Sequence, residues 1–459
     1  ASLTLLFVSC INTNASRTND EEAPEFSEIL PSDSNNLVKL TAALNSSYYL
    51  PGKMDDGAYL YLEVKTKAID LEGVTRKPLN LSLVIDRSGS MEGDKMAYAK
   101  QAASFLVDNL NSNDYLSIVS YDDEVMTEWA SGLIKDKTLI KAKIEGLFDR
   151  GSTNLGGGML QGYDEVKKTF NIEYTNRVLL LTDGLANVGV TDPYALGKIA
   201  RNMNIESNMS LSTFGVGSDY NEDLLQSLAE NGGGNYYYIS SPDEIPSIFK
   251  QEINGLLTVI AQNTKLEVSL PEGVSVSHVF GFKSESDNNK LSIYFRDLSA
   301  DDTKGVLVKF KVDNDFDGDL QFSSKLKYFE AIGEMQEQEL LVNMVMQPTT
   351  ENALVSESRS KTVEQWVTFY EANLVLEKAM EEADKGNYED AKVLLKSNEL
   401  YLEQRTYKWG SNKASGNAAV VNEAYDSLVN RMDDMGEAEK KTYQKEYKNE
   451  NYKMKVRKK

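Results

Sequence analysis

Apolar and polar residues follow different patterns in successive parts of the chain. The first pattern is strict alternation: Ala58, Leu60, Leu62 and Val64 fall on one face of an extended segment. Alternation with a period of two is typical of a half-buried β-strand. Residues 38–44 predict a second strand. The chain before residue 80 therefore favours β-structure.

Between about residues 79 and 261, short apolar runs alternate with segments of helical spacing. Strands are expected at 81–85, 115–121, 177–182, 210–216 and 236–239. Helices are expected at 95–110, 135–147, 157–169, 193–205, 222–230 and 244–257. The runs at 81–85 and 177–182 are almost continuously apolar, as in strands buried on both faces. Repeated β-α units predict a mostly parallel sheet with helices on both faces.

Beyond residue 262 the pattern changes twice. Strands separated by turns are expected at 265–270, 276–280, 290–295, 305–312, 320–328 and 337–346, which favours an antiparallel sandwich. From residue 363 the pattern is helical, with a second helix opening at 385–391 and a last helix after a loop at 409–416. The motif Gly386-x-Tyr388-x-x-Ala391 resembles a tetratricopeptide hairpin, and a plain helical hairpin is the alternative.

These patterns combine into one predicted fold class. We expect a doubly wound, mostly parallel, Rossmann-like α/β sheet inserted in a β-sandwich, with a helical C-terminal region. The expected boundaries are a signal-peptide remnant at 1–10, a flexible tether at 11–36, β-strands at 37–78, the α/β domain at 79–261, the sandwich at 262–350 and the helical region at 351–459. The early strands are expected to complete the sandwich.

The N-terminal residues look like a targeting segment. A short apolar run, Leu3–Val8, is followed by Ser9 and Cys10, and Phe7-Val8-Ser9-Cys10 resembles a bacterial lipobox with Phe in place of the usual Leu. An ordinary secretory peptide with an incidental cysteine is the alternative. We expect a protein lipidated at Cys10 and anchored to the cell envelope, on the outer-membrane, periplasmic or surface face.

Composition excludes several classes of function. A net charge of −22 disfavours a nucleic-acid partner, because phosphates would be repelled. His278 and Cys10 are each the sole residue of their type, so a histidine triad, a Cys–His pair or a zinc cluster has too few ligands. His278 lies in an alternating strand and is interpreted as structural. Phosphate-binding glycine motifs are also missing from the sequence.

Oxygen-bearing side chains follow the first buried strand of the α/β pattern. Asp86, Ser88 and Ser90 come directly after residues 81–85, and Gly89 lets the loop turn tightly. Carboxyl ends of parallel strands face the crevice where α/β sheets bind ligands. One carboxylate and two hydroxyls suit a hard cation such as Mg²⁺, Ca²⁺ or Mn²⁺.

Two later loops add ligands at the same sheet edge. Thr153 precedes an expected helix, and Asp183 ends the strand at 177–182. The set Asp86-x-Ser88-x-Ser90, Thr153 and Asp183 resembles the metal-ion-dependent adhesion site (MIDAS) of von Willebrand factor A (VWA) domains. The flanking segments resemble bacterial secreted proteins described as Ca-activated-chloride-channel-like, or as similar to inter-alpha-trypsin-inhibitor heavy chains.

The resemblance implies a metal-bridged binding function and no catalysis. In the family the three hydroxyls ligate the metal directly, Asp86 and Asp183 often act through water, and a partner's carboxylate fills the open position. The implied cofactor is Mg²⁺, or Ca²⁺ or Mn²⁺, and the implied partner is a protein that supplies an acidic residue. The alternatives are a scaffold or assembly factor with a structural metal and, third, a carboxylate hydrolase using Asp86 and Asp183.

Two other acidic segments are weaker candidates. Residues 313–319 resemble the start of an EF-hand loop, but Ser324 stands where the closing Glu belongs, so an acidic hairpin turn is expected. Asp122-Asp123-Glu124 follows an expected strand and is interpreted as a solvated turn.

Overall fold

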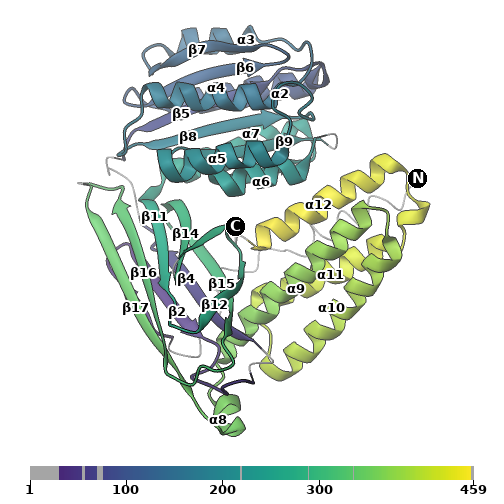
Figure 1. Cartoon of the computed structure of the whole chain (residues 1–459). Helices are drawn as coiled ribbons and strands as arrows, with labels where there is room; N and C mark the ends of the chain where they lie inside the picture. Colours follow the sequence, from purple (N-terminus) through teal and green to yellow (C-terminus); the bar gives the residue numbers. More distant parts are fainter. Residues whose placement is uncertain are drawn as a thin grey trace.

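The fold is described from a computed structural model, which covers residues 30–53, 57–69, 76–217, 220–287, 289–333 and 335–455. An α/β domain, a β-sandwich and a helical region form three distinct bodies (Figure 1). The expected leader, Cys10 and most of the expected tether lie outside the described residues. Within them, no helix is both long enough and apolar enough to span a bilayer.

The α/β domain is built on a six-stranded sheet in the order β10-β9-β8-β5-β6-β7. Its strands are β5 (Leu79–Asp86), β6 (Tyr115–Tyr121), β7 (Val125–Leu133), β8 (Thr175–Thr182), β9 (Ser210–Val216) and β10 (Gly233–Ile239). Every residue of β5 and β8 is buried, as their apolar runs predict. Only β7 is antiparallel. Strand β7 was not predicted, because it lies at the sheet edge and none of its residues is fully buried.

Helices cover both faces of this sheet. They are α2 (Asp94–Asn109), α3 (Lys137–Glu145), α4 (Leu155–Lys168), α5 (Pro193–Ser207), α6 (Glu222–Gly232) and α7 (Ile245–Leu257), with 3₁₀ turns η1 (Gly89–Met91) and η2 (Pro242–Glu244). Helices α2, α3 and α7 pack on the face that carries Leu83, and α4, α5 and α6 pack on the face that carries Val84. Successive strand residues point to opposite faces, so one apolar run feeds two cores.

The β-sandwich consists of two sheets, in the orders β1-β2-β4-β15-β12 and β13-β14-β11-β16-β17-β3. Its strands are β1 (Ser32–Ser34), β2 (Val38–Leu44), β3 (Tyr48–Tyr49), β4 (Ala58–Thr66), β11 (Val259–Ser269), β12 (Val274–Phe280), β13 (Ser284–Asp287), β14 (Lys290–Ser299), β15 (Thr303–Val312), β16 (Leu320–Glu330) and β17 (Glu337–Pro348). Strand β4, which precedes the inserted α/β domain in the chain, pairs with β15, which follows it. The predicted fold class, an α/β domain inserted in a sandwich, is confirmed.

Two details of the sandwich differ from or refine the expectation. Ser32–Ser34, within the segment expected to be a tether, forms β1 and pairs with β2. The acidic residues 313–319 form the turn between β15 and β16. Asp313 donates its amide to Gly273 O at 2.7 Å, which ties this turn to the start of β12.

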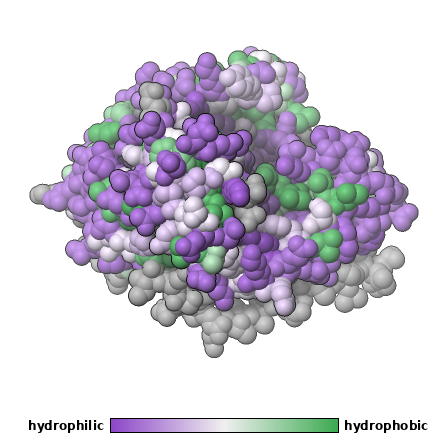
Figure 2. All heavy atoms as spheres, turned by 60° about the horizontal axis from the view of Figure 1, so that its bottom comes forward, coloured by the Kyte–Doolittle hydropathy of each residue, from purple (hydrophilic) through white to green (hydrophobic). Residues whose placement is uncertain are grey.

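The helical region contains more helices than the three that the pattern indicates. Its helices are α8 (Asn352–Glu357), α9 (Lys361–Asp384), α10 (Tyr388–Trp409), α11 (Lys413–Val429) and α12 (Glu437–Lys455), with a 3₁₀ turn η3 (Met432–Asp434). The expected single last helix is therefore wrong: it is two helices, α11 and α12, broken near Gly436. Viewed from the α8 end of the molecule, the surface is mostly hydrophilic. Hydrophobic side chains gather on the side of the molecule that the helical region forms (Figure 2).

Helix α12 packs against α9 and α11 and also reaches the α/β domain (Figure 1). Tyr452 is 3 % exposed, belongs to the core under α5 and α6, and meets Tyr236 edge-on at 5.4 Å between ring centroids. Lys445 donates to Tyr220 O at 2.7 Å and forms an ion pair with Glu222. The C-terminal helix thus fastens the helical region to the edge of the parallel sheet.

Candidate metal centre

The centre begins at the carboxyl end of β5, which delivers Asp86 into the protein interior. Asp86 is fully buried; its Oδ1 accepts from Ser88 N at 2.8 Å and its Oδ2 accepts from Thr182 Oγ1 at 2.5 Å. Burial raises the pKa of Asp86 to about 6, against the opposing effect of these hydrogen bonds. The hydrogen bonds hold the carboxyl group in one orientation, and a cation beside it would stabilise its charged form.

The loop after β5 brings Ser88 and Ser90 next to Asp183, which follows β8. Ser88 Oγ lies 3.0 Å from Ser90 Oγ, and Ser90 Oγ donates to Asp183 Oδ1 at 2.7 Å. Asp183 is fully buried and Ser88 is 2 % exposed, whereas Ser90 is exposed to solvent. Four of the five predicted residues thus form one connected cluster that opens to the surface at Ser90.

Thr153, the fifth predicted residue, reaches the same place from the loop before α4. A Cβ placed on Gly184 would lie 3.1 Å from Thr153 Oγ1 and 3.6 Å from Ser90 Oγ. A side chain at this position would crowd Thr153 Oγ1, because 3.1 Å is tighter than an ordinary van der Waals contact. Thr153 itself is 4 % exposed, and its amide donates to Asn187 Oδ1 at 2.9 Å. All five predicted site residues therefore converge.

These residues fit a hard divalent cation. The donor set is three hydroxyls and two carboxylates, all oxygen, converging on a cradle that a Cβ at Gly184 would fill. Mg²⁺, Ca²⁺ and Mn²⁺ favour such ligands, and soft metals do not. Ser88, Ser90 and Thr153 would hold the ion by their hydroxyls, with Asp86 and Asp183 supplying the negative charge.

A lysine beside the cluster was missed by sequence analysis. Lys95, at the start of α2, donates from Nζ to Asp183 Oδ2 at 2.5 Å and to Ser90 O at 3.1 Å. Its side chain is 25 % exposed, so the ammonium reaches the site from the solvent side. Lys95 gives Asp183 a counter-charge of its own and bears on how strongly a cation binds.

Asp122 corrects another expectation, because it is not part of a solvated turn. It is fully buried, and its Oδ2 lies 3.1 Å from Arg87 Nη2 and 2.7 Å from Arg150 Nε. Its Oδ1 accepts from Glu124 N at 2.6 Å. The guanidinium of Arg87 is itself 4 % exposed, so this is a buried, charge-assisted contact.

Asp122 joins the two loops that carry the hydroxyl groups. Asn154 N donates to Asp122 O at 2.8 Å, Arg150 N donates to Arg87 O at 2.7 Å, and Gly89 N donates to Gly151 O at 3.1 Å. Side-chain ion pairs and main-chain hydrogen bonds therefore fix the Ser88–Ser90 loop against the Thr153 loop. A carboxylate directly after β6, at the same sheet edge as Asp86, is the sequence signal for this role.

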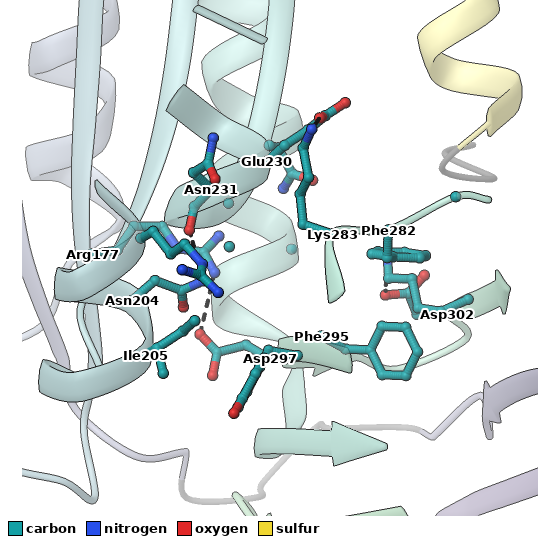
Figure 3. A pocket seen from close by; sticks show the side chains of 18 of the residues that line it. Arg177, Asn204, Ile205, Glu230, Asn231, Phe282, Lys283, Phe295, Asp297 and Asp302 are labelled. Carbon is teal, nitrogen blue, oxygen red and sulfur yellow. Dashed lines mark hydrogen bonds and ion pairs between the residues drawn. The ribbon is translucent and has the colours of Figure 1, made fainter. Parts of the chain in front are cut away.

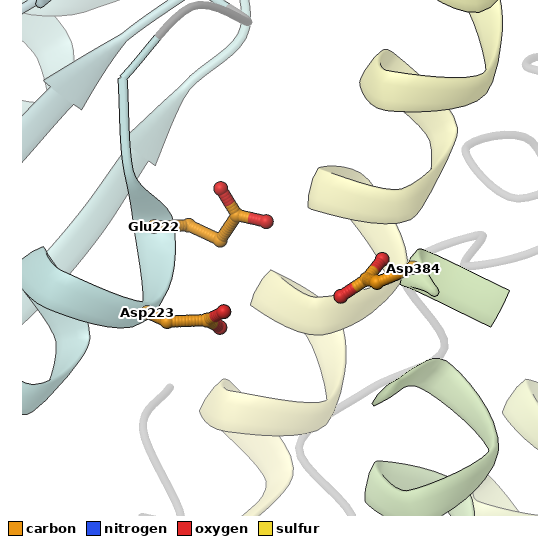
Figure 4. A group of neighbouring side chains, drawn as sticks. All are labelled: Glu222, Asp223 and Asp384. Atoms are coloured by element: carbon orange, nitrogen blue, oxygen red, sulfur yellow. The ribbon is translucent and has the colours of Figure 1, made fainter. Parts of the chain in front are cut away.

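A second acidic group lies between α6 and the helical region, and lysines of α12 form ion pairs with it. Glu222 and Asp223 approach Asp384 across the gap between their helices (Figure 4). Lys448 Nζ lies 3.0 Å from Glu222 Oε1 and 3.3 Å from Asp223 Oδ1, and pairs with Asp384 as well. The group is an ion-pair network that docks α12.

A cavity of about 130 Å³ lies where the α/β domain meets the sandwich (Figure 3). Arg177 and Asp297 point toward each other there, 3.2 Å apart, and Arg177 also pairs with Glu252 at 2.9 Å. Lys283 lies 3.6 Å from Glu230. Because these charges pair with one another, we interpret the cavity as a polar joint between domains.

His278 packs edge-on to Phe280 at 4.3 Å between centroids, consistent with a structural role.

The fold and the converging oxygen ligands define a class of protein, an α/β domain with a cation-type site at the carboxyl ends of its strands. The von Willebrand factor type A domain matches residues 80–251. The chain therefore carries a VWA domain, a class whose MIDAS motifs bind divalent metals and whose members take part in metal-dependent protein interactions. The resemblance inferred from Asp86, Ser88, Ser90, Thr153 and Asp183 is confirmed at the level of the domain.

Known proteins resemble this chain over different shares of its length. YfbK, an uncharacterized protein of Escherichia coli K12, is 34% identical over 227 residues, covering 48% of this chain and 39% of that protein. Human inter-alpha-trypsin inhibitor heavy chain H3 is 30% identical over 200 residues, covering 41% and 22%. The chain thus matches well under two thirds of these relatives. A von Willebrand factor type A structure from Catenulispora acidiphila aligns with a TM-score of 0.65 at 15% identity, covering 83% and 89%, which shows the fold.

Proposed function

We propose that this protein binds a protein partner through a divalent cation held by Asp86, Ser88, Ser90, Thr153 and Asp183. The observation that carries the proposal is the convergence of these five side chains on the space beside Gly184, with Ser90 exposed to solvent. A bound Mg²⁺, Ca²⁺ or Mn²⁺ with an open position offers positive charge to a partner's Asp or Glu. The three hydroxyl ligands are neutral, and carboxylates that act through water would neutralise the cation only in part, which leaves positive charge at the open position.

The function proposed is binding and not catalysis. Asp86 is held by Ser88 N and Thr182 Oγ1, and Asp183 by Ser90 and Lys95. Both carboxylates of the site thus belong to the ligand cluster. A hydrolase would need a general acid separate from these ligands. A scaffold whose metal is only structural is the competing proposal.

Retention of a partner from cell-envelope extract separates these proposals. The full chain is immobilised and washed with Mg²⁺ or with EDTA, beside the variants Asp86→Ala and Ser90→Ala in Mg²⁺. We expect retention by the wild type in Mg²⁺ alone. Ser90→Ala is included because Ser90 is exposed and its loss spares the fold. Equal retention under all conditions contradicts the metal bridge and favours the scaffold.

We propose further that the protein is anchored to the envelope by a lipid on Cys10. The support is the lipobox-like sequence Phe7-Val8-Ser9-Cys10 after a short apolar run. Labelled fatty acid is expected to enter the full-length protein in bacterial cells and to be lost in Cys10→Ser. Absence of label in the wild type contradicts the anchor and leaves the metal proposal untouched.

A further inference from the structure

Three large apolar side chains are exposed on the segment that follows Asp183. Leu185 is 53 % exposed, Val190 39 % and Tyr194 80 %. Single exposed apolar residues are ordinary, whereas a group of them beside a binding site is a candidate contact surface. The segment starts directly after Gly184, the residue that faces the hydroxyls of Thr153 and Ser90. We call Leu185, Val190 and Tyr194 the apolar rim.

Hydrogen bonds hold the rim in place against the metal centre. The amides of Asn187 and Val188 donate to Thr153 O at 3.1 and 3.2 Å. Val190 lies against Gly156, at which an added Cβ would come within 2.7 Å of Val190 O. Tyr194 stands in the first turn of α5, which Asp192 caps through a hydrogen bond to Ala195 N at 2.7 Å. The exposed side chains therefore sit on a backbone that is already ordered.

The part of the segment that carries Leu185 and Val190 is also free of charge. Residues 184–191 contain no Asp, Glu, Lys or Arg, although 26% of the whole chain is charged, and Asp192, between Val190 and Tyr194, caps α5. Another edge of the site has the opposite character, because Arg150 and Glu124 form an exposed ion pair there at 2.6 Å. One side of the centre therefore suits apolar groups, and another suits polar ones.

We propose that the partner segment carries an Asp or Glu with apolar residues beside it, and that these residues pack on the apolar rim. This inference rests on the proposed function, because the acidic side chain takes the open position of the cation. Its neighbours on one side then cover Leu185, Val190 and Tyr194. Leu185, Val190 and Tyr194 supply contact area that a lone carboxylate lacks. Selectivity among acidic partners comes from the rim.

Selection from a displayed random-peptide library tests this pairing. The full chain is the bait, in Mg²⁺ and in EDTA, as the wild type and as Leu185→Ser/Val190→Ser/Tyr194→Ser. The matched control is Val393→Ser/Leu400→Ser/Tyr407→Ser, which removes the same three residue types from exposed positions of α10. Mg²⁺ uptake and thermal unfolding of each variant are measured in parallel, and both are expected to match the wild type.

The expected result is enrichment, in Mg²⁺ alone, of peptides with Asp or Glu beside apolar residues. The rim variant should bind these peptides about ten- to a hundredfold more weakly, and the α10 control should bind like the wild type. Magnesium-dependent enrichment of acidic peptides without apolar neighbours, or equal binding by the rim variant, overturns the inference and leaves the proposed function standing. Enrichment that EDTA does not change overturns the proposed function itself.

Discussion

Asp122→Asn tests whether a buried carboxylate holds the two hydroxyl-bearing loops together. The substitution keeps the shape of the side chain and removes its charge. Among the described residues, Arg87, 4 % exposed, then retains only Glu128 at 3.9 Å as an ion-pair partner, whereas Arg150 is 42 % exposed and can be rehydrated. Breaking a buried ion pair costs roughly 3–5 kcal/mol. The remaining contact to Glu128 places the expected cost near the lower bound, about 3 kcal/mol.

Hydrogen exchange measures this loss where it occurs. The amides of Gly89, Arg150 and Asn154 donate to the opposite loop or to Asp122 itself, so they report whether the loops stay joined. A loss of about 3 kcal/mol in local stability corresponds to exchange faster by roughly a hundredfold. Weaker Mg²⁺ binding should accompany it. The exposed neighbour variant Asp123→Asn is the control and should exchange like the wild type. Exchange within about threefold of the wild type in Asp122→Asn would show that Asp122 does not hold the two loops together.

Three further predictions concern other contacts. Lys95→Met should bind Mg²⁺ several-fold more tightly, as measured by calorimetry. The reason is that a positive charge 2.5 Å from Asp183 weakens cation binding by about 1 kcal/mol or more. Weaker binding by the variant contradicts this prediction. Tyr452→Ala should lower the free energy of unfolding by about 3 kcal/mol and expose α12 to proteolysis, with Tyr407→Ala, 96 % exposed, as the neutral control. Lys265 and Lys290 hold the pKa of Glu267 at about 2. Glu267 therefore stabilises the fold above pH ~4.5, and this stabilisation is lost as pH falls toward ~2. The unfolding midpoint of Glu267→Gln should change less than that of the wild type between pH ~4.5 and ~2, and an unchanged pH dependence contradicts this prediction.

The sequence predicted the parts of the fold that follow from local periodicity. The apolar runs of β5 and β8 and the alternation in β4 carry their own signal, and the insertion of one domain in another followed from the order of the patterns. The site was also predictable, because Asp86, Thr153 and Asp183 stand at the ends of strands or before helices on one sheet edge. Parallel topology then brings them together without further information.

The remainder depends on contacts between distant segments, which leave no local pattern. Strand β7 sits at an edge without a fully buried residue, so its sequence lacks alternation. Helix α12 reads as a polar, highly charged segment, yet Tyr452 and Lys445 are nearly buried because they meet the α/β domain more than 200 residues away in sequence. In the sequence, Asp122 cannot be told apart from an aspartate in a solvated turn. Its role becomes visible from the positions of Arg87 and Arg150 in the structure.

Calorimetric titration of the full, EDTA-treated chain with Mg²⁺, Mn²⁺ and Ca²⁺ is the most direct test of the metal centre. The wild type should take up one cation per chain. Ser90→Ala/Thr153→Ala, which removes two hydroxyls from the cradle beside Gly184, should lose that uptake while keeping the unfolding midpoint of the metal-free protein. A wild type that takes up none of the three cations, or a double variant that binds them equally well, contradicts the account.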